Sequence, residues 1–294
     1  MKSILKLVML LLIIVSFVAC SSDDDSPTTK NLTLNIEGLD ELGSDFVYEG
    51  WIIVNGNPVS TGTFSSVTFP QTFSVNIDDL DAATKFVLSI EPTNDSDPLP
   101  SNTKILAGDF AGTSASVTTM PVGNYQNAVG KYILATPTNG ASTNENSGIW
   151  FLDLPNSTPP PLVGLTLPTL PEGWKYEGWA VINGTPVTTG KFTNVAATDE
   201  FNDYSGPDAL GMPNGADGFF PGEDFLNNAP NGLTFPTDLA GGTAVISIEP
   251  EPDNSPMPFT LKPLVGAIPA NAVDHVTYNM DLNLASFPSG SVSR

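Results

Sequence analysis

The sequence predicts an all-β protein that consists of two tandem antiparallel β-sandwich domains of the Ig-like kind. Its 294 residues include 26 Gly and 27 Pro, and the apolar runs between these turn residues are short, as is typical of β-proteins. No window holds a sustained helical period. Two long blocks of sequence occur twice, which indicates that one folding unit is used twice.

The internal repeat determines the predicted domain organisation. Residues 48–64 return as residues 176–192 without a gap, and residues 89–108 return as residues 247–266. The offsets are 128 and 158 residues, so the second copy carries about 30 additional residues between its blocks. The matched side chains include Tyr48, Glu49, Trp51 and Lys104 in the first copy and Tyr176, Glu177, Trp179 and Lys262 in the second.

We therefore divide the chain into four parts. They are a signal peptide (1–19), a lipidated cysteine with a flexible acidic tether (20–30), a first sandwich repeat (31–128), and a second repeat (129–294) with an N-terminal hairpin and an acidic loop insertion. The roughly 275 residues after the signal are enough for two domains with separate cores.

The start of the chain predicts where the protein resides. Lys2 and Lys6 precede an apolar run over residues 7–18, which is short for a membrane span and typical of a secretory signal. Residues 17–20, Phe-Val-Ala-Cys, resemble a bacterial lipobox, in which the cysteine carries the lipid. The alternative is an ordinary signal peptide or an N-terminal anchor helix. The acidic stretch after Cys20 is similar to the surface-export signal of Bacteroidetes-type lipoproteins, or is a solvated spacer. We expect a cell-envelope lipoprotein of the outer membrane, with surface exposure left open, that binds the lipid bilayer through Cys20.

The charge balance limits the classes of partner. The sequence has 32 acidic and 10 basic residues, and its net charge is −22. Nucleic acids and anionic lipid surfaces both need a basic surface, so neither is an expected direct partner. Divalent cations are the partners that such a charge favours. Cys20 is the only cysteine, so no intrachain disulfide is expected.

In the first repeat, alternating apolar residues and turn signals predict seven strands. Asn55-Gly56 lies between two apolar runs and is a strong hairpin signal, because a type I′ turn needs positive φ at both central residues. Asp-rich turns lie between the two strands that follow this hairpin. The predicted strands are 32–36, 46–54, 58–64, 73–77, 85–90, 104–108 and 115–118.

The second repeat uses the same signals. Asn183-Gly184 repeats the hairpin turn, and a polar loop separates the first two strands. The predicted strands are 130–137, 148–153, the two arms of 176–192, 244–248, 262–268 and 275–284, followed by a polar Ser-rich tail.

The additional loop of the second copy, roughly residues 198–228, is our first choice for a ligand or partner surface, because binding residues concentrate on long loops. The residues concerned are Asp217, Phe219, Phe220, Glu223 and Asp224. Glycines between the carboxylates make calcium at Asp217, Glu223 and Asp224 the one cofactor to consider. The spacing is not that of an EF-hand, and a solvated loop above packed Phe219 and Phe220 is the alternative.

The matched glutamates lie on the same strand face as the matched tryptophans, Trp51 and Trp179. An exposed Trp/Glu patch would suit a glycan or a peptide. Buried tryptophan beside a hydrogen-bonded glutamate would instead stabilise the fold, with Lys104 and Lys262 as partners. We favour this structural interpretation of Glu49 and Glu177, because folding explains their presence in both copies equally well.

Catalysis has little support in the sequence. His275 is the only histidine, so a Ser-His-Asp triad would depend on it alone. No Gly-x-Ser-x-Gly motif or second cysteine is present, and no carboxylate pair stands out for glycosidic chemistry. We expect no catalytic residues and no enzyme.

Each copy contains an aromatic-Gly-Trp strand, an Asn-Gly-x-Pro-Val turn, and later a Ser-Ile-Glu-Pro strand with a Pro-rich turn. This order, in residues 31–118 and again in 162–290, resembles the extracytoplasmic C-terminal domain of anti-sigma-K factors (RskA), an all-β sandwich. The turns at residues 93–98 and 251–256 depart from the Gly- and Ser-rich turn of that family. In the family, a cytoplasmic segment holds the sigma factor and a transmembrane helix joins it to this domain, and this sequence shows neither.

The resemblance implies an outer sensing or binding module in duplicate, without sigma-factor inhibition. We therefore expect a non-catalytic lipid-anchored protein that binds an unknown envelope protein or glycan. A calcium- or glycan-dependent surface adhesion module is the alternative.

Overall fold

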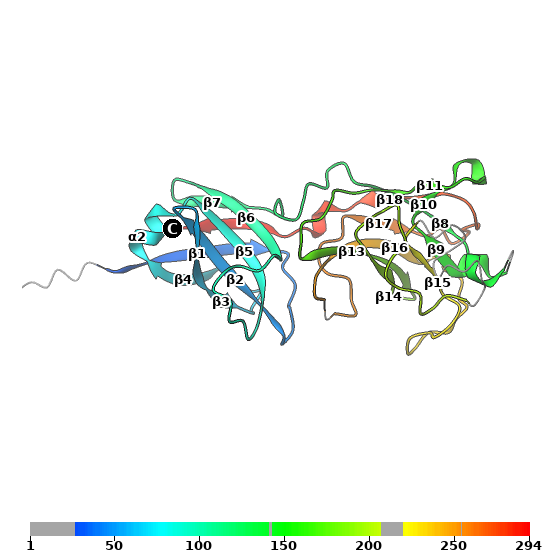
Figure 1. The fold of residues 1–294 in the computed structure, drawn as a ribbon, viewed down its shortest axis with the longest axis horizontal. Helices are drawn as coiled ribbons and strands as arrows, with labels where there is room; N and C mark the ends of the chain where they lie inside the picture. Colours follow the sequence, from blue (N-terminus) through cyan, green and yellow to red (C-terminus); the bar gives the residue numbers. More distant parts are fainter. Residues whose placement is uncertain (1–26, 141–142, 207–219, 254) are drawn as a thin grey trace, which may run out of the picture.

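The computed structural model describes residues 27–140, 143–206, 220–253 and 255–294. These residues form two β bodies that lie end to end (Figure 1). All the strand pairs within each body are antiparallel. The prediction of an all-β, sandwich-like fold is confirmed. Among the described residues, no helix has the length and apolar character to cross a membrane.

The first body is an eight-stranded sheet that folds over onto itself, with the strand order β3-β2-β5-β6-β7-β19-β1-β4. A short helix, α2 (Ile77–Ala82), occupies the predicted Asp-rich turn, and the Asn76 side chain accepts hydrogen bonds from the backbone N–H groups of its first turn. The strands are β1 (Thr29–Glu37), β2 (Phe46–Val54), β3 (Asn57–Phe64), β4 (Gln71–Asn76), β5 (Lys85–Pro92), β6 (Lys104–Ala111), β7 (Ser114–Val117) and β19 (Ser289–Ser293).

The second body is a nine-stranded sheet with the order β14-β13-β16-β17-β18-β8-β9-β15, in which β12 pairs with β8. Its strands are β8 (Val129–Leu134), β9 (Gly148–Trp150), β12 (Leu165–Thr166), β13 (Trp174–Ile182), β14 (Thr185–Phe192), β15 (Gly222–Asp224), β16 (Thr243–Pro250), β17 (Leu264–Ala267) and β18 (Tyr278–Leu282). The short strands β10 (Leu152–Asp153) and β11 (Leu162–Val163) pair separately. Four 3₁₀ turns complete the described part, η1 (Pro137–Asn139), η2 (Glu145–Ser147), η3 (Pro155–Ser157) and η4 (Leu284–Ser286).

The sequence repeat is also a structural repeat. The order β3-β2-β5-β6 of the first body recurs as β14-β13-β16-β17 in the second. The register of the first hairpin shifts between Gly50 and Trp51, and that of the second shifts at the matched place. Both Asn-Gly turns have positive φ at both residues, as the type I′ prediction requires.

The end of the chain differs from the prediction. We expected a polar tail within the second repeat, but β19 lies in the first body between β1 and β7. Thr33 pairs with Ser293, and Val117 pairs with Gly290. Val292 is the one apolar residue of β19 and is fully buried, so no periodicity in the sequence could reveal this strand. The predicted boundary at residue 128 stays a prediction.

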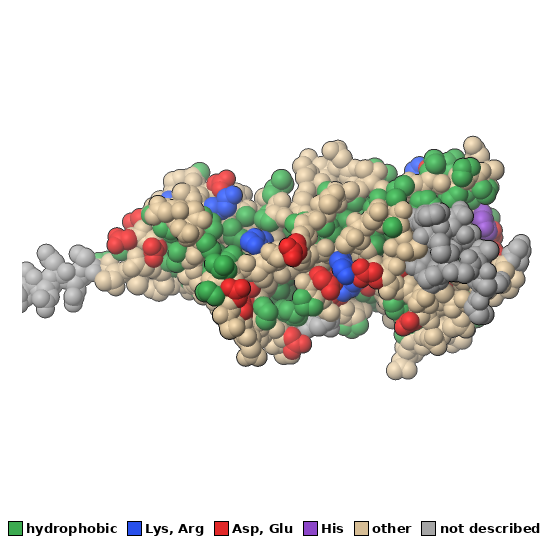
Figure 2. All heavy atoms as spheres, viewed as in Figure 1, with side chains coloured by type: hydrophobic (Ala, Val, Ile, Leu, Met, Phe, Trp, Pro, Cys, Tyr) green, Lys and Arg blue, Asp and Glu red, His purple; other side chains and the backbone are tan. Residues whose placement is uncertain are grey.

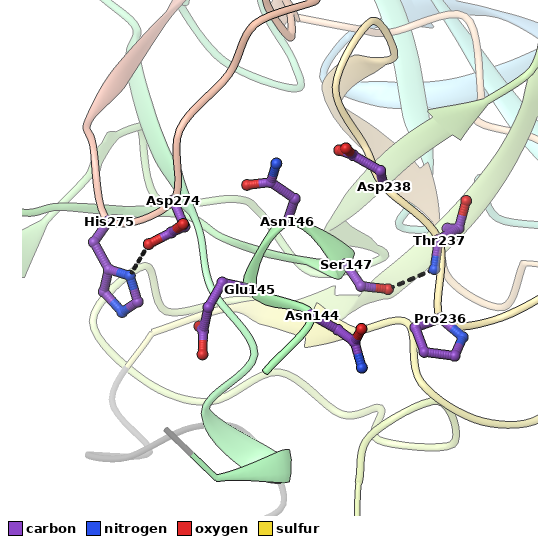
Figure 3. A pocket seen from close by; sticks show the side chains of 9 residues that line it. All are labelled: Asn144, Glu145, Asn146, Ser147, Pro236, Thr237, Asp238, Asp274 and His275. Carbon is purple, nitrogen blue, oxygen red and sulfur yellow. Dashed lines mark hydrogen bonds and ion pairs between the residues drawn. The ribbon is translucent and has the colours of Figure 1, made fainter. Parts of the chain in front are cut away.

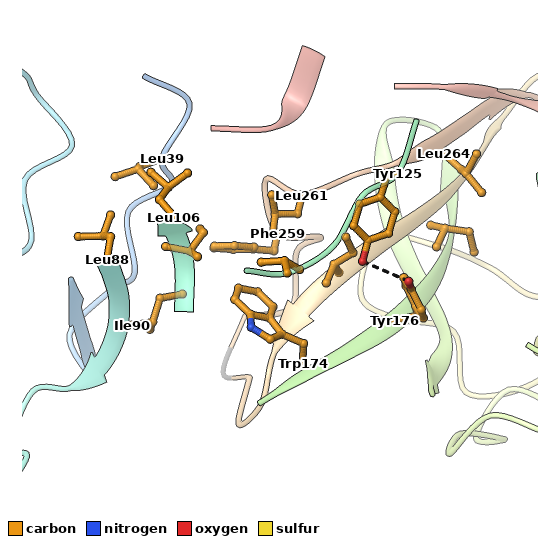
Figure 4. Close-up of a cluster of buried hydrophobic side chains, with 14 of the residues drawn as sticks. Leu39, Leu88, Ile90, Leu106, Tyr125, Trp174, Tyr176, Phe259, Leu261 and Leu264 are labelled. Atoms are coloured by element: carbon orange, nitrogen blue, oxygen red, sulfur yellow. Dashed lines mark hydrogen bonds between the residues drawn. The ribbon is translucent and has the colours of Figure 1, made fainter. Parts of the chain in front are cut away.

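Apolar side chains of the two bodies meet in one continuous core (Figure 4). Leu39 and Leu106 of the first body face Trp174 and Phe259 of the second. The Trp174 and Phe259 rings lie 6.2 Å apart. At the same boundary, Thr260 Oγ1 donates a hydrogen bond of 3.0 Å to the Gly38 carbonyl. The two bodies are therefore joined by packing as well as by the chain.

Candidate functional site: the acidic face of the second repeat

Each repeat contains the same buried chain of hydrogen bonds. Trp179 Nε1 donates to Ser247 Oγ at 2.7 Å, and Ser247 donates to the Glu249 carboxylate. The backbone N–H of Phe259 then donates to Glu249 Oε1 at 3.0 Å. We call this the Trp-Ser-Glu relay.

In the first repeat the relay consists of Trp51, Ser89 and Glu91, and the last donor is the backbone N–H of Ser101. Both tryptophans are buried. The relay explains why Ser-Ile-Glu-Pro recurs, because the serine and the glutamate are needed to satisfy polar groups in the interior.

The glutamates of the aromatic-Gly-Trp strands accept hydrogen bonds from the neighbouring strand. Thr188 Oγ1 donates to Glu177 Oε1 at 2.5 Å, and Ser60 donates to Glu49. Burial raises the pKa of Glu177 to about 7, and burial raises the pKa of Glu249 to about 8. Two acidic groups therefore lie close together in the interior of the second repeat.

The matched lysines and tyrosines have other partners. Lys104 Nζ donates to the Ser101 carbonyl at 2.6 Å, and the backbone N–H of Lys262 donates to Ser286 Oγ. Among the ion pairs of the described residues, neither lysine meets Glu49 or Glu177. The Tyr48 and Tyr176 hydroxyls each donate to a carbonyl eight residues upstream, at 2.8 and 2.7 Å, and so hold the chain that leads into each repeat.

A lysine makes the second copy different from the first, because it forms ion pairs with the acidic turn at residues 251–256. Lys191 of β14 lies opposite Glu177, and its ammonium group is 3.1 Å from Asp253 and 3.6 Å from Glu251. Lys175 adds an ion pair of 2.7 Å with Glu200. On the face drawn in Figure 2, acidic side chains occur on both bodies.

We call the sheet surface around Glu177, Lys191, Glu249 and the turn at residues 251–256 the acidic face, and a pocket of about 580 Å³ lies over it. Glu177, Trp179 and Lys191 belong to its wall, with Phe201 and Tyr204 of the additional loop and Met257 of the acidic turn. Since the additional loop forms part of the wall, the pocket is specific to the second repeat.

The structure places the acidic residues of the additional loop differently from the prediction. Glu223 and Asp224 form part of β15 and are fully buried. Asp224 accepts hydrogen bonds from the Thr138 backbone, the Thr138 hydroxyl and Trp150 Nε1 at 2.8, 2.6 and 2.9 Å. Ser205 donates to Glu223. The Asp224 carboxylate thus connects the additional loop to the rest of the body, whereas the Glu223 carboxylate joins two parts of the loop itself, and neither faces outwards.

Phe220 packs against the small cluster around Trp150. Asp217, Phe219 and Cys20 lie outside the described residues. The calcium site at Asp217, Glu223 and Asp224 and the lipid on Cys20 stay predictions. Burial raises the pKa of Glu223 to about 8 and that of Asp224 to about 6.

His275 lies beside a second pocket, of about 560 Å³ (Figure 3). It lies in a turn before β18, with a φ of 56°, rather than in the predicted strand. Its Nδ1 is 2.8 Å from Asp274 Oδ1. Ser147 lines the same pocket, but its hydroxyl donates to the Phe225 carbonyl and accepts from the Thr237 backbone. These contacts do not couple the serine to the histidine as a nucleophile to its base.

Sequence reasoning missed Ser247, Glu249, Asp253 and Lys191 as members of the acidic face. The identity of Ser-Ile-Glu-Pro in both copies could have indicated the first two. Lys191 carries no such signal, because the first copy has Thr63 in its place. Asp253 is matched by Asp95, but in a turn whose neighbouring residues differ between the copies.

The relay is expected to contribute measurably to stability. In Ser247→Ala, Trp179 Nε1 and Glu249 each lose a buried partner, so the free energy of unfolding should fall by about 1–3 kcal/mol. Urea unfolding measures the change, and Ser89→Ala tests the matched position. Ser291→Ala, at an exposed serine, is the control. Equal stability of Ser247→Ala and Ser291→Ala would show that the relay contributes nothing.

The protein belongs to the class of duplicated antiparallel β proteins. Its repeated polar motifs mainly satisfy buried groups, and an acidic pocket lies in the second copy. Residues 24–104 match the family model of the anti-sigma-K factor RskA C-terminal domain. The match extends from before β1 to the first residue of β6. No curated protein and no solved structure matched the chain significantly. The resemblance of residues 162–290 to this family stays a prediction.

Proposed function

We propose that the protein is a non-catalytic, lipid-anchored component of the cell envelope whose β bodies sense or bind a partner. The match of residues 24–104 to an anti-sigma-factor outer domain carries this proposal. That family is regulatory, and the matched domain is its extracytoplasmic part. The lipobox-like residues before Cys20 support the anchor. Binding of a sigma factor is not part of the proposal, because the match covers the outer domain alone.

The anchor is tested by Cys20→Ser in the native host. The wild-type chain should take up labelled palmitate and sediment with membranes. The variant should lose both properties, because the lipid needs the thiol. Ser21→Ala is the matched control and should behave as the wild type. A labelled, sedimenting Cys20→Ser chain would contradict the lipobox interpretation.

The binding function is tested by crosslinking in envelope extract, with residues 21–294 as bait. We expect one specific protein to be recovered with and without calcium. A chain whose residues 207–219 are replaced by a Gly/Ser linker should lose this protein if the additional loop is the partner surface. Unchanged recovery would exclude residues 207–219 of the loop as the binding surface.

Calcium- or glycan-dependent adhesion is the second candidate function. The acidic face of the second repeat favours it, because carboxylates gather there on one side of a pocket. Recovery of a partner only with calcium, or of polysaccharide alone, would support adhesion over sensing.

A further inference from the structure

Three carboxylates of the second repeat come together at the acidic face. Glu177 of β13, Glu249 of β16 and Asp253 of the following turn each place one oxygen within 4.8 Å of the other two. The sheet register causes part of this arrangement. Glu177 pairs with Ser247, and Glu249 lies two residues further along the same face.

Each carboxylate is held in place by a neighbouring donor. Thr188 Oγ1 donates to Glu177 and the Phe259 backbone to Glu249. The Ser255 backbone N–H donates to Asp253 at 2.8 Å. Such supporting hydrogen bonds orient the ligands of metal sites.

One oxygen in this group lacks a partner. The Glu177 residue is 5% exposed, and its Oε2 atom is buried with no hydrogen-bond partner in the described part of the chain. A buried carboxylate oxygen without a partner is costly. Glu91 Oε2 of the first repeat is also buried without a partner in the described residues. Of these two glutamates, only Glu177 has two further carboxylate oxygens of described residues within 4.8 Å, and this combination indicates a ligand that supplies positive charge.

The first repeat shows that folding does not require the carboxylates to gather. It has the matched residues Glu49, Glu91 and Asp95. Asp95 is exposed, although it accepts from the Asp97 backbone the same hydrogen bond that Asp253 accepts from Ser255. The cluster found in the second repeat does not recur among these described residues.

Solvent reaches the cluster from two sides. Glu177 and Asp253 line the pocket of about 580 Å³ described above. Glu249 and Asp253 line another pocket, of about 520 Å³, at the boundary with the first body. An ion therefore has a path to the carboxylates, which a metal site requires.

We propose that Glu177, Glu249 and Asp253 bind a divalent cation of the calcium type. Carboxylate oxygens up to 4.8 Å apart fit a cation that binds oxygen at about 2.3–2.6 Å. The set contains neither sulfur nor imidazole, so it suits a hard cation. Lys191, 3.1 Å from Asp253, competes with the cation for this carboxylate, and Glu251 is its other acidic partner.

The test uses the purified full-length chain with calcium and with terbium as a luminescent calcium probe. We expect terbium emission excited through tryptophan, because the Trp179 indole is linked to Glu249 by one hydroxyl. Calcium should displace terbium, and calorimetry should show calcium binding at this site. Asp253→Asn and Glu177→Gln should each weaken binding at least tenfold.

The first repeat provides matched controls. Asp95→Asn and Glu49→Gln should leave the affinity unchanged. Glu177→Gln also separates binding from folding, since the neutral amide keeps an acceptor for Thr188. Its melting temperature without calcium should be equal to or above that of the wild type, while the rise with calcium disappears.

The absence of calcium and terbium binding would overturn the proposal. Binding that survives both Asp253→Asn and Glu177→Gln would also overturn it, because the ion would then lie elsewhere. The site does not depend on the proposed sensing function, so a negative result leaves the lipid anchor and the partner search unchanged, but it removes the support for calcium-dependent adhesion.

Discussion

Val292→Asp is expected to unfold the first body. Val292 is fully buried in β19, where it pairs with Leu34 of β1 and Ala115 of β7. An aspartate there would place an unpaired charge between two strands, which costs more than about 3 kcal/mol. For a chain of this size we expect the melting temperature to fall by roughly 10 °C.

Ser293→Asp, at the exposed neighbouring residue, is the matched control and should change stability little. Thermal unfolding by circular dichroism measures both variants. Limited proteolysis should cut Val292→Asp first in residues 29–117. If both variants melt together with the wild type, β19 does not close the first sheet.

Stability is expected to fall as the pH rises from about 5 to 8. The pKa of Glu223 is raised to about 8 and that of Asp224 to about 6. In the unfolded chain these groups lose their protons near pH 4. Between these values the folded state binds more protons than the unfolded state, so stability is greatest at the acidic end and decreases until the pH passes the folded pKa values.

Glu177 and Glu249, with pKa values of about 7 and 8, add an effect in the same direction. The total change is of the order of several kcal/mol, since one pKa unit corresponds to about 1.4 kcal/mol. Urea unfolding at several pH values in EDTA measures it. Glu223→Gln should flatten the dependence, because glutamine stays neutral at every pH. Glu200→Gln, at a half-exposed ion pair, should not flatten it. Stability that rises from pH 5 to 8 would contradict the prediction.

The local signals of the sequence predicted the repeated unit well. Asn55-Gly56 and Asn183-Gly184 require their turns by backbone conformation alone, and the flanking alternation fixes which side chains are buried. The pairing of β2 with β3 and of β13 with β14 follows from these hairpins. Such features depend on residues close in the chain, so a sequence pattern contains them.

The parts that were not predicted depend on partners far apart in the chain. The Asp224 carboxylate looked like part of a solvated loop, but its donors come from Thr138 and Trp150, 86 and 74 residues away. Asp253, in the turn after β16, comes close to Glu177 of β13. Lys191 forms an ion pair with Asp253 at the same place. A stretch of acidic residues, glycine and proline looks the same in the sequence in both cases. Its carboxylates can face solvent, or they can be buried against hydrogen-bond donors.

The position of β19 determines how the protein would bear a mechanical load. The second body is connected to the first through β7 on the way out and β19 on the way back, and these two strands pair side by side. In a chain tethered at Cys20, a pull on the second body would act on β19 at Ser289, and the tether would act on β1 at Thr29. Ser289 pairs with Glu37 at the far end of β1, so the β1–β19 ladder would be loaded in shear. All five of its residue pairs would resist together, whereas β7 and β19 would be pulled in the same direction, because both connect to the second body at the same end of their ladder.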